Sequence, residues 1–343
     1  MNAPGKLVRI LSIDGGGIRG IIPGRILMYL EKKLQELDNN PEARLADYFD
    51  MIAGTSTGGI LTCTFLCPDP DREGRPKFTA AEAVDLYIKR GRLIFSRSLW
   101  QIIRSAWGLF DEKHSESEIE RAFSDYFGNT KLSELLKPSL VTAYDIERRS
   151  AFFFTGHNAG AKKMDFLLRD VARATSAAPT YFEAAGIRST GGDFYALVDG
   201  GVFANNPAMC AYAEARKTDF GPGLNKPTAI NMAILSIGTG IVKKPYRYSI
   251  AKRWGTLGWI KPVIDIMMSG VAETVDYQLK QIFDSVNMSK HYLRIAPDLA
   301  NASPEMDEVS EKNLDALSEA GDLAVEKYLA DIDSFAKILI SGG

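Results

Sequence analysis

A serine between glycines, in the pentapeptide Gly54-Thr55-Ser56-Thr57-Gly58, constrains the fold of this chain more than any other feature. The apolar run Tyr48–Ala53 before it is typical of a buried strand, and Ile60–Leu66 after it can form a buried helix. G-x-S-x-G between a strand and a helix is the pattern of a nucleophile elbow, a turn too sharp for side chains at the two glycine positions. The alternative is a Gly/Ser/Thr-rich turn without a chemical role. The elbow pattern predicts that Ser56 stands at the tip of the turn, beside the N-terminal amides of the helix.

A second glycine-rich turn precedes the elbow. The apolar run Leu7–Ile13 predicts a strand, Gly15–Gly17 a loop, and the stretch from about Ile22 to Leu37 a helix. Strand, glycine loop and helix begin a parallel α/β sheet, in which this loop and the elbow lie at the same edge. The spacing Gly15-x-Gly17-x-x-Gly20 also matches a dinucleotide fingerprint, but the second strand ends in the serine turn instead of the required acidic residue. The favoured interpretation is that the loop's N–H groups converge on an oxyanion.

The composition is that of a globular protein without a nucleic-acid partner. The chain has 343 residues, 45% of them hydrophobic and 24% charged, and a formal net charge of −2, which argues against a general nucleic-acid binder. Its three cysteines form no disulfide framework, and no cofactor or metal site is expected. The N-terminus does not read as a signal peptide, and no apolar run reaches the roughly 18 residues of a membrane span. The expected compartment is the cytoplasm.

Two further motifs follow the elbow. The segment Ser176–Phe182 contains Ala178-Pro179-Thr180-Tyr181-Phe182, and the predicted strand Phe194–Val198 leads into Asp199-Gly200-Gly201. The glycines after Asp199 leave room beside its carboxylate for a substrate and a tight turn. Predicted strands also cover 139–145, 151–155 and 231–237, and the remainder is mostly helical, with a short strand near Tyr292–Ile295.

These motifs, in this order, resemble those of the patatin-like phospholipases. The residues that carry the resemblance are Asp14-Gly15-Gly16-Gly17-Ile18-Arg19-Gly20, Gly54-Thr55-Ser56-Thr57-Gly58, Ala178-Pro179-Thr180-Tyr181-Phe182 and Asp199-Gly200-Gly201. The resemblance, to bacterial-type members with a single catalytic domain, covers roughly residues 7–245. Residues 246–343 match only loosely and are expected to form a mostly helical extension packed on the core, so that 1–343 is one domain.

The resemblance implies a fold and an activity. The fold would be an α/β/α sandwich with a mainly parallel central sheet. The activity would be calcium-independent hydrolysis of fatty acyl esters of phospholipids or lysophospholipids, through an acyl-enzyme and a Ser-Asp dyad. By motif, Ser56 would be the nucleophile, Asp199 its base, and the N–H groups of Gly15, Gly16 and Gly17 the oxyanion hole, with Thr57 as an extra donor. The supporting motif residues would be Asp14, Arg19, Gly54, Gly58, Gly200 and Gly201.

Several alternatives stay open at this level. Ser56, Asp199 and His291 stand in the chain order of an α/β-hydrolase triad, although in that fold the elbow usually follows several strands. A non-enzymatic protein could use the glycine loops to bind a nucleotide or phosphate. Arg19 suits a lipid phosphate, but it can equally pair with a local carboxylate, the more ordinary role.

The expected partners are lipids. The stretch Leu93–Phe110 has helical periodicity, with Trp100 and Trp107 beside arginines, and predicts either a peripheral membrane contact or a helix packed on the sheet. Some bacterial proteins that this chain resembles are anti-phage effectors, silent until a cyclic dinucleotide binds. Such an activator is therefore a further expectation, although no nucleotide motif supports it.

Overall fold

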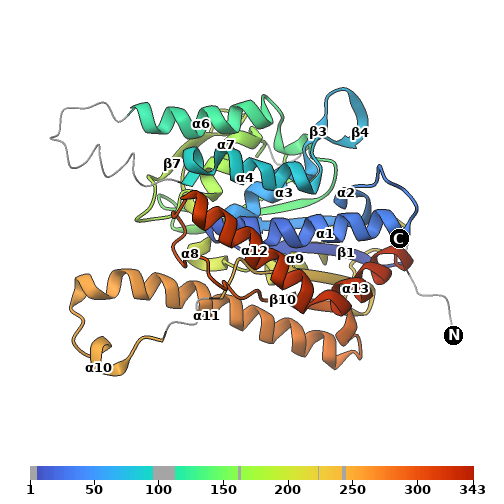
Figure 1. The fold of residues 1–343 in the computed structure, drawn as a ribbon. Coiled ribbons are helices and arrows are strands. Elements are labelled where there is room, and N and C mark those ends of the chain that lie inside the picture. The colour runs from blue at the N-terminus through green and yellow to red at the C-terminus, as the bar shows by residue number, and fades with distance from the viewer. Residues whose placement is uncertain (1–5, 96–112, 161–163, 223, 242–244) are drawn as a thin grey trace.

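The computed structural model describes residues 6–95, 113–160, 164–222, 224–241 and 245–343. Its centre is an eight-stranded sheet in the order β10-β9-β1-β2-β5-β8-β7, with β6 paired to β5 (Figure 1). The strands are β1 Val8–Ile13, β2 Met51–Thr55, β5 Ser139–Asp145, β6 Ser150–Thr155, β7 Ala185–Arg188, β8 Phe194–Asp199, β9 Met232–Ile237 and β10 Tyr292–Ile295. A separate hairpin consists of β3 Pro68–Asp69 and β4 Arg72–Pro76.

The sheet is mainly parallel. Strands β10, β9, β1, β2 and β5 pair in parallel, whereas β6 and β8 run antiparallel to β5, and β7 runs antiparallel to β8. The central strands are buried on both faces: Leu11 and Ile13 of β1 belong to one apolar core, and Val8 and Ile10 belong to the other. Continuous apolar runs are what a parallel sheet covered on both faces requires.

Helices cover both faces. The helices are α1 Ile21–Leu37, α2 Leu45–Tyr48, α3 Thr57–Leu66, α4 Ala80–Phe95, α6 Lys113–Phe127, α7 Leu168–Thr175, α8 Gly201–Ala204, α9 Ala208–Ala215, α10 Tyr248–Ala251, α11 Thr256–Ser285, α12 Glu311–Lys327 and α13 Leu329–Ser341. Side chains of α1, α3, α4, α7, α12 and α13 build one core, and side chains of α9 and α11 contribute to the other. In Figure 1, α4 lies above the sheet and α11 lies below it. The expected α/β fold, with helices flanking a mainly parallel sheet, is confirmed.

The C-terminal part of the chain contributes to the sheet itself. The short strand expected near Tyr292–Ile295, within the mostly helical residues 246–343, is β10; it is the edge strand of the central sheet and pairs with β9. The backbone N–H of Leu7 donates to the carbonyl of Gly342 at 3.0 Å, so the C-terminus lies beside the start of β1. Removing this part would therefore expose one edge of the sheet.

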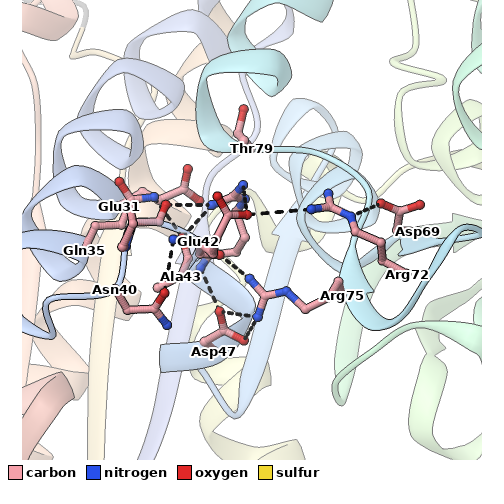
Figure 2. A network of polar contacts seen from close by, with 12 residues as sticks. Glu31, Gln35, Asn40, Glu42, Ala43, Asp47, Asp69, Arg72, Arg75 and Thr79 are labelled. Atoms are coloured by element: carbon pink, nitrogen blue, oxygen red, sulfur yellow. Dashed lines mark hydrogen bonds and ion pairs between the residues drawn. The ribbon is translucent and has the colours of Figure 1, made fainter.

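A buried carboxylate joins the end of α1 to the helices that follow it. Glu31 accepts hydrogen bonds from the backbone N–H groups of Leu45 at 3.2 Å and Ala80 at 3.0 Å, which begin α2 and α4. Burial is the largest influence on the Glu31 carboxyl and raises its pKa, although these N–H groups oppose the rise. Figure 2 shows Glu31 within a wider polar network that also reaches Arg72 and Arg75 of the β3–β4 hairpin. The network lies at the far end of α1 from the glycine loop.

Candidate active site

Ser56 lies at the tip of a strained turn between β2 and α3. Its backbone has φ 54° and ψ −121°, a left-handed conformation that a serine rarely adopts. A Cβ at Gly54 would collide with the backbone of Gly58, and a Cβ at Gly58 would collide with the carbonyl of Ile13. The turn can therefore form only with glycine at both positions, as the pentapeptide predicted.

A threonine pair fixes the elbow to the neighbouring strand. The backbone N–H of Ser56 donates to Oγ1 of Thr175 at 2.9 Å, and this hydroxyl donates to the carbonyl of Thr142 in β5 at 2.7 Å. All three groups are buried, so each would be costly to leave without a partner. Thr175 thus holds the serine backbone in its strained conformation, and the Ser56 N–H is not free to bind substrate.

The sheet register brings Asp199 level with Ser56. Thr55 of β2 pairs with Thr142 of β5, and Ala143, the next residue of β5, pairs with Asp199 at the end of β8. Ser56 and Asp199 therefore flank β5 at the same height, and both line one cavity. A Cβ at Gly200 would collide with Thr142, so the turn after Asp199 also requires glycine.

Burial gives the Asp199 carboxyl the properties of a base. Its exposed fraction is 4%, and removal from water raises its pKa from 3.8 to about 7. The Ser56 side chain and the Gly201 N–H, which donates to Oδ1 at 2.7 Å, both lower the pKa, but by less than burial raises it. A group that titrates near neutral pH is well matched to accepting and returning a proton.

Hydrogen bonds tie the elbow and the first glycine loop to the short helix that follows Asp199. The hydroxyl of Thr55 donates to the carbonyl of Ala204, the last residue of α8, at 2.6 Å. The N–H of Gly15 donates to the carbonyl of Asn205, the next residue, at 3.0 Å. These contacts set the relative positions of Ser56, Asp199 and the loop.

Hydrogen bonds within the site also decide which backbone N–H groups remain available to stabilise an oxyanion. Gly15 was expected among the oxyanion donors, but its N–H is occupied by Asn205. For the N–H groups of Gly16 and Gly17, the described residues supply no hydrogen-bond acceptor, and Gly17 lines the cavity. The hydroxyl of Thr57 donates to Tyr87 at 2.7 Å, so only the backbone N–H of Thr57, at the start of α3, is left for an oxyanion.

The two charged residues of the first motif differ in their surroundings. Asp14 accepts from Nη1 and Nη2 of Arg294 at 2.8 Å and 2.6 Å, a bidentate buried ion pair that anchors the end of β1 to β10. Arg19 is also buried, and its Nε donates to the carbonyl of Gly16 at 3.3 Å. Within the described parts of the chain Arg19 has no carboxylate at ion-pair distance, so the expected local pair is not found there.

The histidines of known position lie at the other end of the sheet. His291 directly precedes β10, which runs parallel to β9 and β1, whereas Ser56 follows the carboxyl end of β2. His157 follows β6, whose last residue pairs near the start of β5. The alternative triad through His291 is therefore wrong. The side chain of His114 lies outside the described residues.

An apolar cavity opens beside Ser56 and Asp199. Its walls come from η1 (Gly17–Gly20), α4, the 176–182 segment, α8 and α11. The lining residues are Gly17, Ser56, Phe95, Ser176, Ala178, Pro179, Tyr181, Phe182, Asp199, Gly201, Val202, Ile264, Met267, Met268 and Met306. Such a lining suits an acyl chain, and methionine adapts readily to different chain shapes.

No sequence pattern indicated several of the residues that build this site. Thr175 and Asn205 resemble ordinary helix and turn residues, and no local pattern links Arg294 to Asp14. The methionines of α11 gave no signal as cavity residues. Of the predicted membrane stretch Leu93–Phe110, only 93–95 is described, at the end of α4, and Phe95 is buried against the cavity. Residues 96–112 lie outside the described residues.

Comparison with known proteins identifies the family. A family model described as "Patatin-like phospholipase" matches residues 11–212. Patatin-like protein 3 of Arabidopsis thaliana is 36% identical to the chain, over 96% of this chain and 83% of that protein. The chain belongs to the patatin-like phospholipase family. As a member, it is a serine lipid acyl hydrolase.

Other relatives extend the similarity beyond the matched model. Patatin-like protein 2 of Oryza sativa subsp. indica is 35% identical, over 96% of this chain and 86% of that protein. Patatin-08 of Solanum tuberosum is 34% identical, over 97% of this chain and 90% of that protein. The C-terminal part is thus shared with plant patatins, and the comparisons support the family and not specifically a bacterial type. The crystal structure of VipD from Legionella pneumophila aligns over 95% of this chain and 67% of that chain, with a TM-score of 0.41 and 12% identity, too low to carry an argument.

Proposed function

We propose that this patatin-family enzyme hydrolyses fatty acyl esters of phospholipids or lysophospholipids, with Ser56 as the nucleophile and Asp199 as its base. The observation that carries the proposal is that both residues open into one apolar cavity. The raised pKa of Asp199, about 7, supports the same roles. A serine hydroxyl needs an adjacent base, and an ester substrate needs an apolar site for its acyl chain.

The reaction takes two acyl-transfer steps. Asp199 accepts the Ser56 proton while Oγ attacks the ester carbonyl carbon, and the N–H groups of Gly16, Gly17 and Thr57 stabilise the oxyanion. The tetrahedral intermediate expels the alcohol, which takes the proton from Asp199. Asp199 then removes a proton from water, the resulting nucleophile attacks the acyl-enzyme, and the fatty acid leaves as Ser56 regains its proton.

The proposal is tested by labelling and by product analysis. We expect a fluorophosphonate probe to modify Ser56, located by mass spectrometry of the digested protein, and phosphatidylcholine or lysophosphatidylcholine to yield free fatty acid. Ser56→Ala is the matched control and should give neither signal. Absence of both signals in a folded wild-type sample would instead favour a protein that binds a ligand without cleaving it.

Activation by a cyclic dinucleotide is a separate expectation. Neither the family match nor any contact in the described residues speaks for it, and the same assay with and without a cyclic dinucleotide decides it. The described residues include no helix that is both long and apolar enough to cross a bilayer. A cytoplasmic location with peripheral membrane contact remains a prediction of the sequence.

A further inference from the structure

An apolar surface covers the outer side of α10 and the first turns of α11. We call it the α10–α11 surface; it consists of Tyr246, Tyr248, Ile250, Trp259, Val263 and Ile266, all of them exposed. The exposed fraction reaches 80% for Tyr248 and 56% for Ile250, unusual values for such large side chains. Figure 1 shows α10 below the first turns of α11, on the side turned away from the sheet. Exposed apolar side chains gathered in one place mark a site of contact with another surface.

Aromatic packing joins the residues that flank α10 to the start of α11. The ring of Trp254 lies edge-on to Tyr246 at 5.3 Å and edge-on to Trp259 at 5.0 Å. The hydroxyl of Tyr246 also donates to Oδ2 of Asp265 in α11 at 2.8 Å. The exposed side chains therefore belong to one ordered structural unit, which can present them together to a partner.

The charged residues of this surface are mostly cations. Arg247, Lys252 and Arg253 are exposed, and in the described part of the chain none of them forms an ion pair with a carboxylate. Lys252 lies over the ring of Tyr248, with Nζ 5.7 Å from the ring centre. The nearby acid, Asp265, already accepts the Tyr246 hydroxyl. A chain with a net charge of −2 thus carries a local cationic cluster here.

The α10–α11 surface is continuous with the cavity that holds Ser56. Ile264, Met267 and Met268 of α11 line the cavity, while Val263 and Ile266, their neighbours along the same helix, face outward. Met267 does both, since it lines the cavity and is 49% exposed. A partner resting on this surface therefore adjoins the wall of the acyl site.

We propose that the α10–α11 surface docks the enzyme on bilayers that contain anionic phospholipid. Tryptophan and tyrosine suit the headgroup layer, isoleucine and valine the acyl boundary below it, and lysine and arginine the anionic phosphates. The proposal rests on the proposed lipid hydrolysis and names the surface through which the substrate is reached. It places the membrane contact on α10 and α11, independently of the stretch Leu93–Phe110.

A charge-reversal variant tests this surface, with a matched control. Arg247→Glu/Lys252→Glu/Arg253→Glu removes the cationic cluster. Lys6→Glu/Lys32→Glu/Lys290→Glu changes the net charge equally, at exposed residues near the amino end of the sheet: Lys6 and Lys290 precede β1 and β10, and Lys32 lies in the later turns of α1. Binding is measured by flotation with vesicles of phosphatidylcholine, with or without phosphatidylglycerol, in a Ser56→Ala background to prevent hydrolysis.

The first variant should bind anionic vesicles roughly 100-fold more weakly, as expected for three cations near a charged membrane, whereas the control should change by about threefold or less. In the Ser56-containing protein, both variants should keep fluorophosphonate labelling and turnover of a soluble short-chain ester. Those two readouts fail in the wild type if the proposed function is wrong, whereas vesicle binding alone fails if only the docking surface is wrong.

A second variant, Tyr248→Ser/Ile250→Ser, removes apolar contacts without changing the charge. It should weaken vesicle binding even at high salt, where the electrostatic attraction is screened. Equal loss of binding in the α10–α11 charge variant and its control would overturn the proposal, as would unchanged binding in both. A dimer that Tyr248→Ser/Ile250→Ser dissociates, with vesicle binding intact, would overturn it in favour of contact with a second copy of the chain.

Discussion

Gly201 donates its backbone N–H to Oδ1 of Asp199 at 2.7 Å, and this contact fixes how the carboxylate faces Ser56. The backbone of the turn thereby holds one oxygen of the carboxylate in place. The N–H group favours the ionised form, but burial outweighs it and keeps the pKa near 7. The turn thus orients the base without making it a weak one.

If Ser56 and Asp199 act as one unit, removing either should cost nearly as much as removing both. We expect Ser56→Ala and Asp199→Asn each to lower kcat on the order of 10³-fold or more, and the double variant to be little worse than either single one. Turnover of a short-chain ester measures this. His291→Ala is the control and should stay within a few-fold, because His291 lies at the other end of the sheet. If the losses in kcat of the two single variants multiply in the double variant, the two residues do not act as a dyad.

The pH dependence should follow Asp199. Only the ionised carboxylate can accept the Ser56 proton, and burial raises its pKa to about 7. We therefore expect kcat/KM for a soluble ester to rise with pH through about 7 and then to level off. A rate that is already maximal at about pH 5, near the range of an ordinary carboxyl, would exclude Asp199 as the titrating base.

The raised pKa of Asp199 also predicts that this carboxyl lowers the stability of the folded protein at neutral pH. The carboxyl titrates near 3.8 when unfolded and near 7 when folded, so between these values the unfolded state is ionised while the folded state keeps its proton. The free energy of unfolding of the wild type should therefore fall as pH rises from about 4 to about 7, relative to Asp199→Asn, which does not titrate. The relative gain of the variant should approach at most about 4 kcal/mol at pH 8. Denaturant unfolding of both proteins at several pH values measures it; a constant difference would show that the pKa is not raised.

A side chain at Gly16 should damage the oxyanion site while leaving Ser56 in place. A Cβ there would collide with the hydroxyl of Thr239, so the loop must shift and its free N–H groups move. We expect Gly16→Val to lower kcat on the order of 10²-fold or more, the scale of losing one oxyanion donor. Gly160→Val is the matched control, since among the described residues, its chain neighbours aside, no atom lies within 4 Å of its Cβ position, and it should keep normal turnover. Normal turnover in Gly16→Val would move the oxyanion donors to the N-terminus of α3.

The parts of the fold that depend on local sequence could be predicted. The strand over 139–145 is found with those limits as β5, and the short strand near Tyr292–Ile295 is β10. The elbow was predictable because its glycines are dictated by the backbone of the same turn. The strand before it was predicted too early, since β2 begins at Met51 and α2 covers 45–48. Asp47 and Asp50 lie at the junction between α2 and β2, and such polar residues are compatible with either structure.

The long-range parts could not be predicted. The position of Asp199 across β5 from Ser56 depends on the antiparallel pairing of β8 with β5, which no motif encodes. The occupied N–H of Gly15 depends on Asn205, which is far away in the sequence. Similarly, the methionines of α11 become cavity residues only because the helix crosses the site. Each of these depends on how distant segments meet, and a single sequence does not record that.

The ion pair between Asp14 and Arg294 offers a test of how the C-terminal part supports the site. The two side chains are 4% and 10% exposed, and Arg294 also donates to the hydroxyl of Ser236 at 2.8 Å. Arg294→Met would leave a buried carboxylate at the end of β1 without its cation, so we expect a loss of about 3–5 kcal/mol in the free energy of unfolding. Asp14→Asn/Arg294→Met removes both charges and should recover much of that loss, because two well-packed neutral side chains can replace a buried pair. Chemical unfolding of Arg294→Met, of Asp14→Asn and of the double variant gives the coupling energy directly. Losses that simply add would mean that the two charges are independent, and that β10 holds the glycine loop by packing alone.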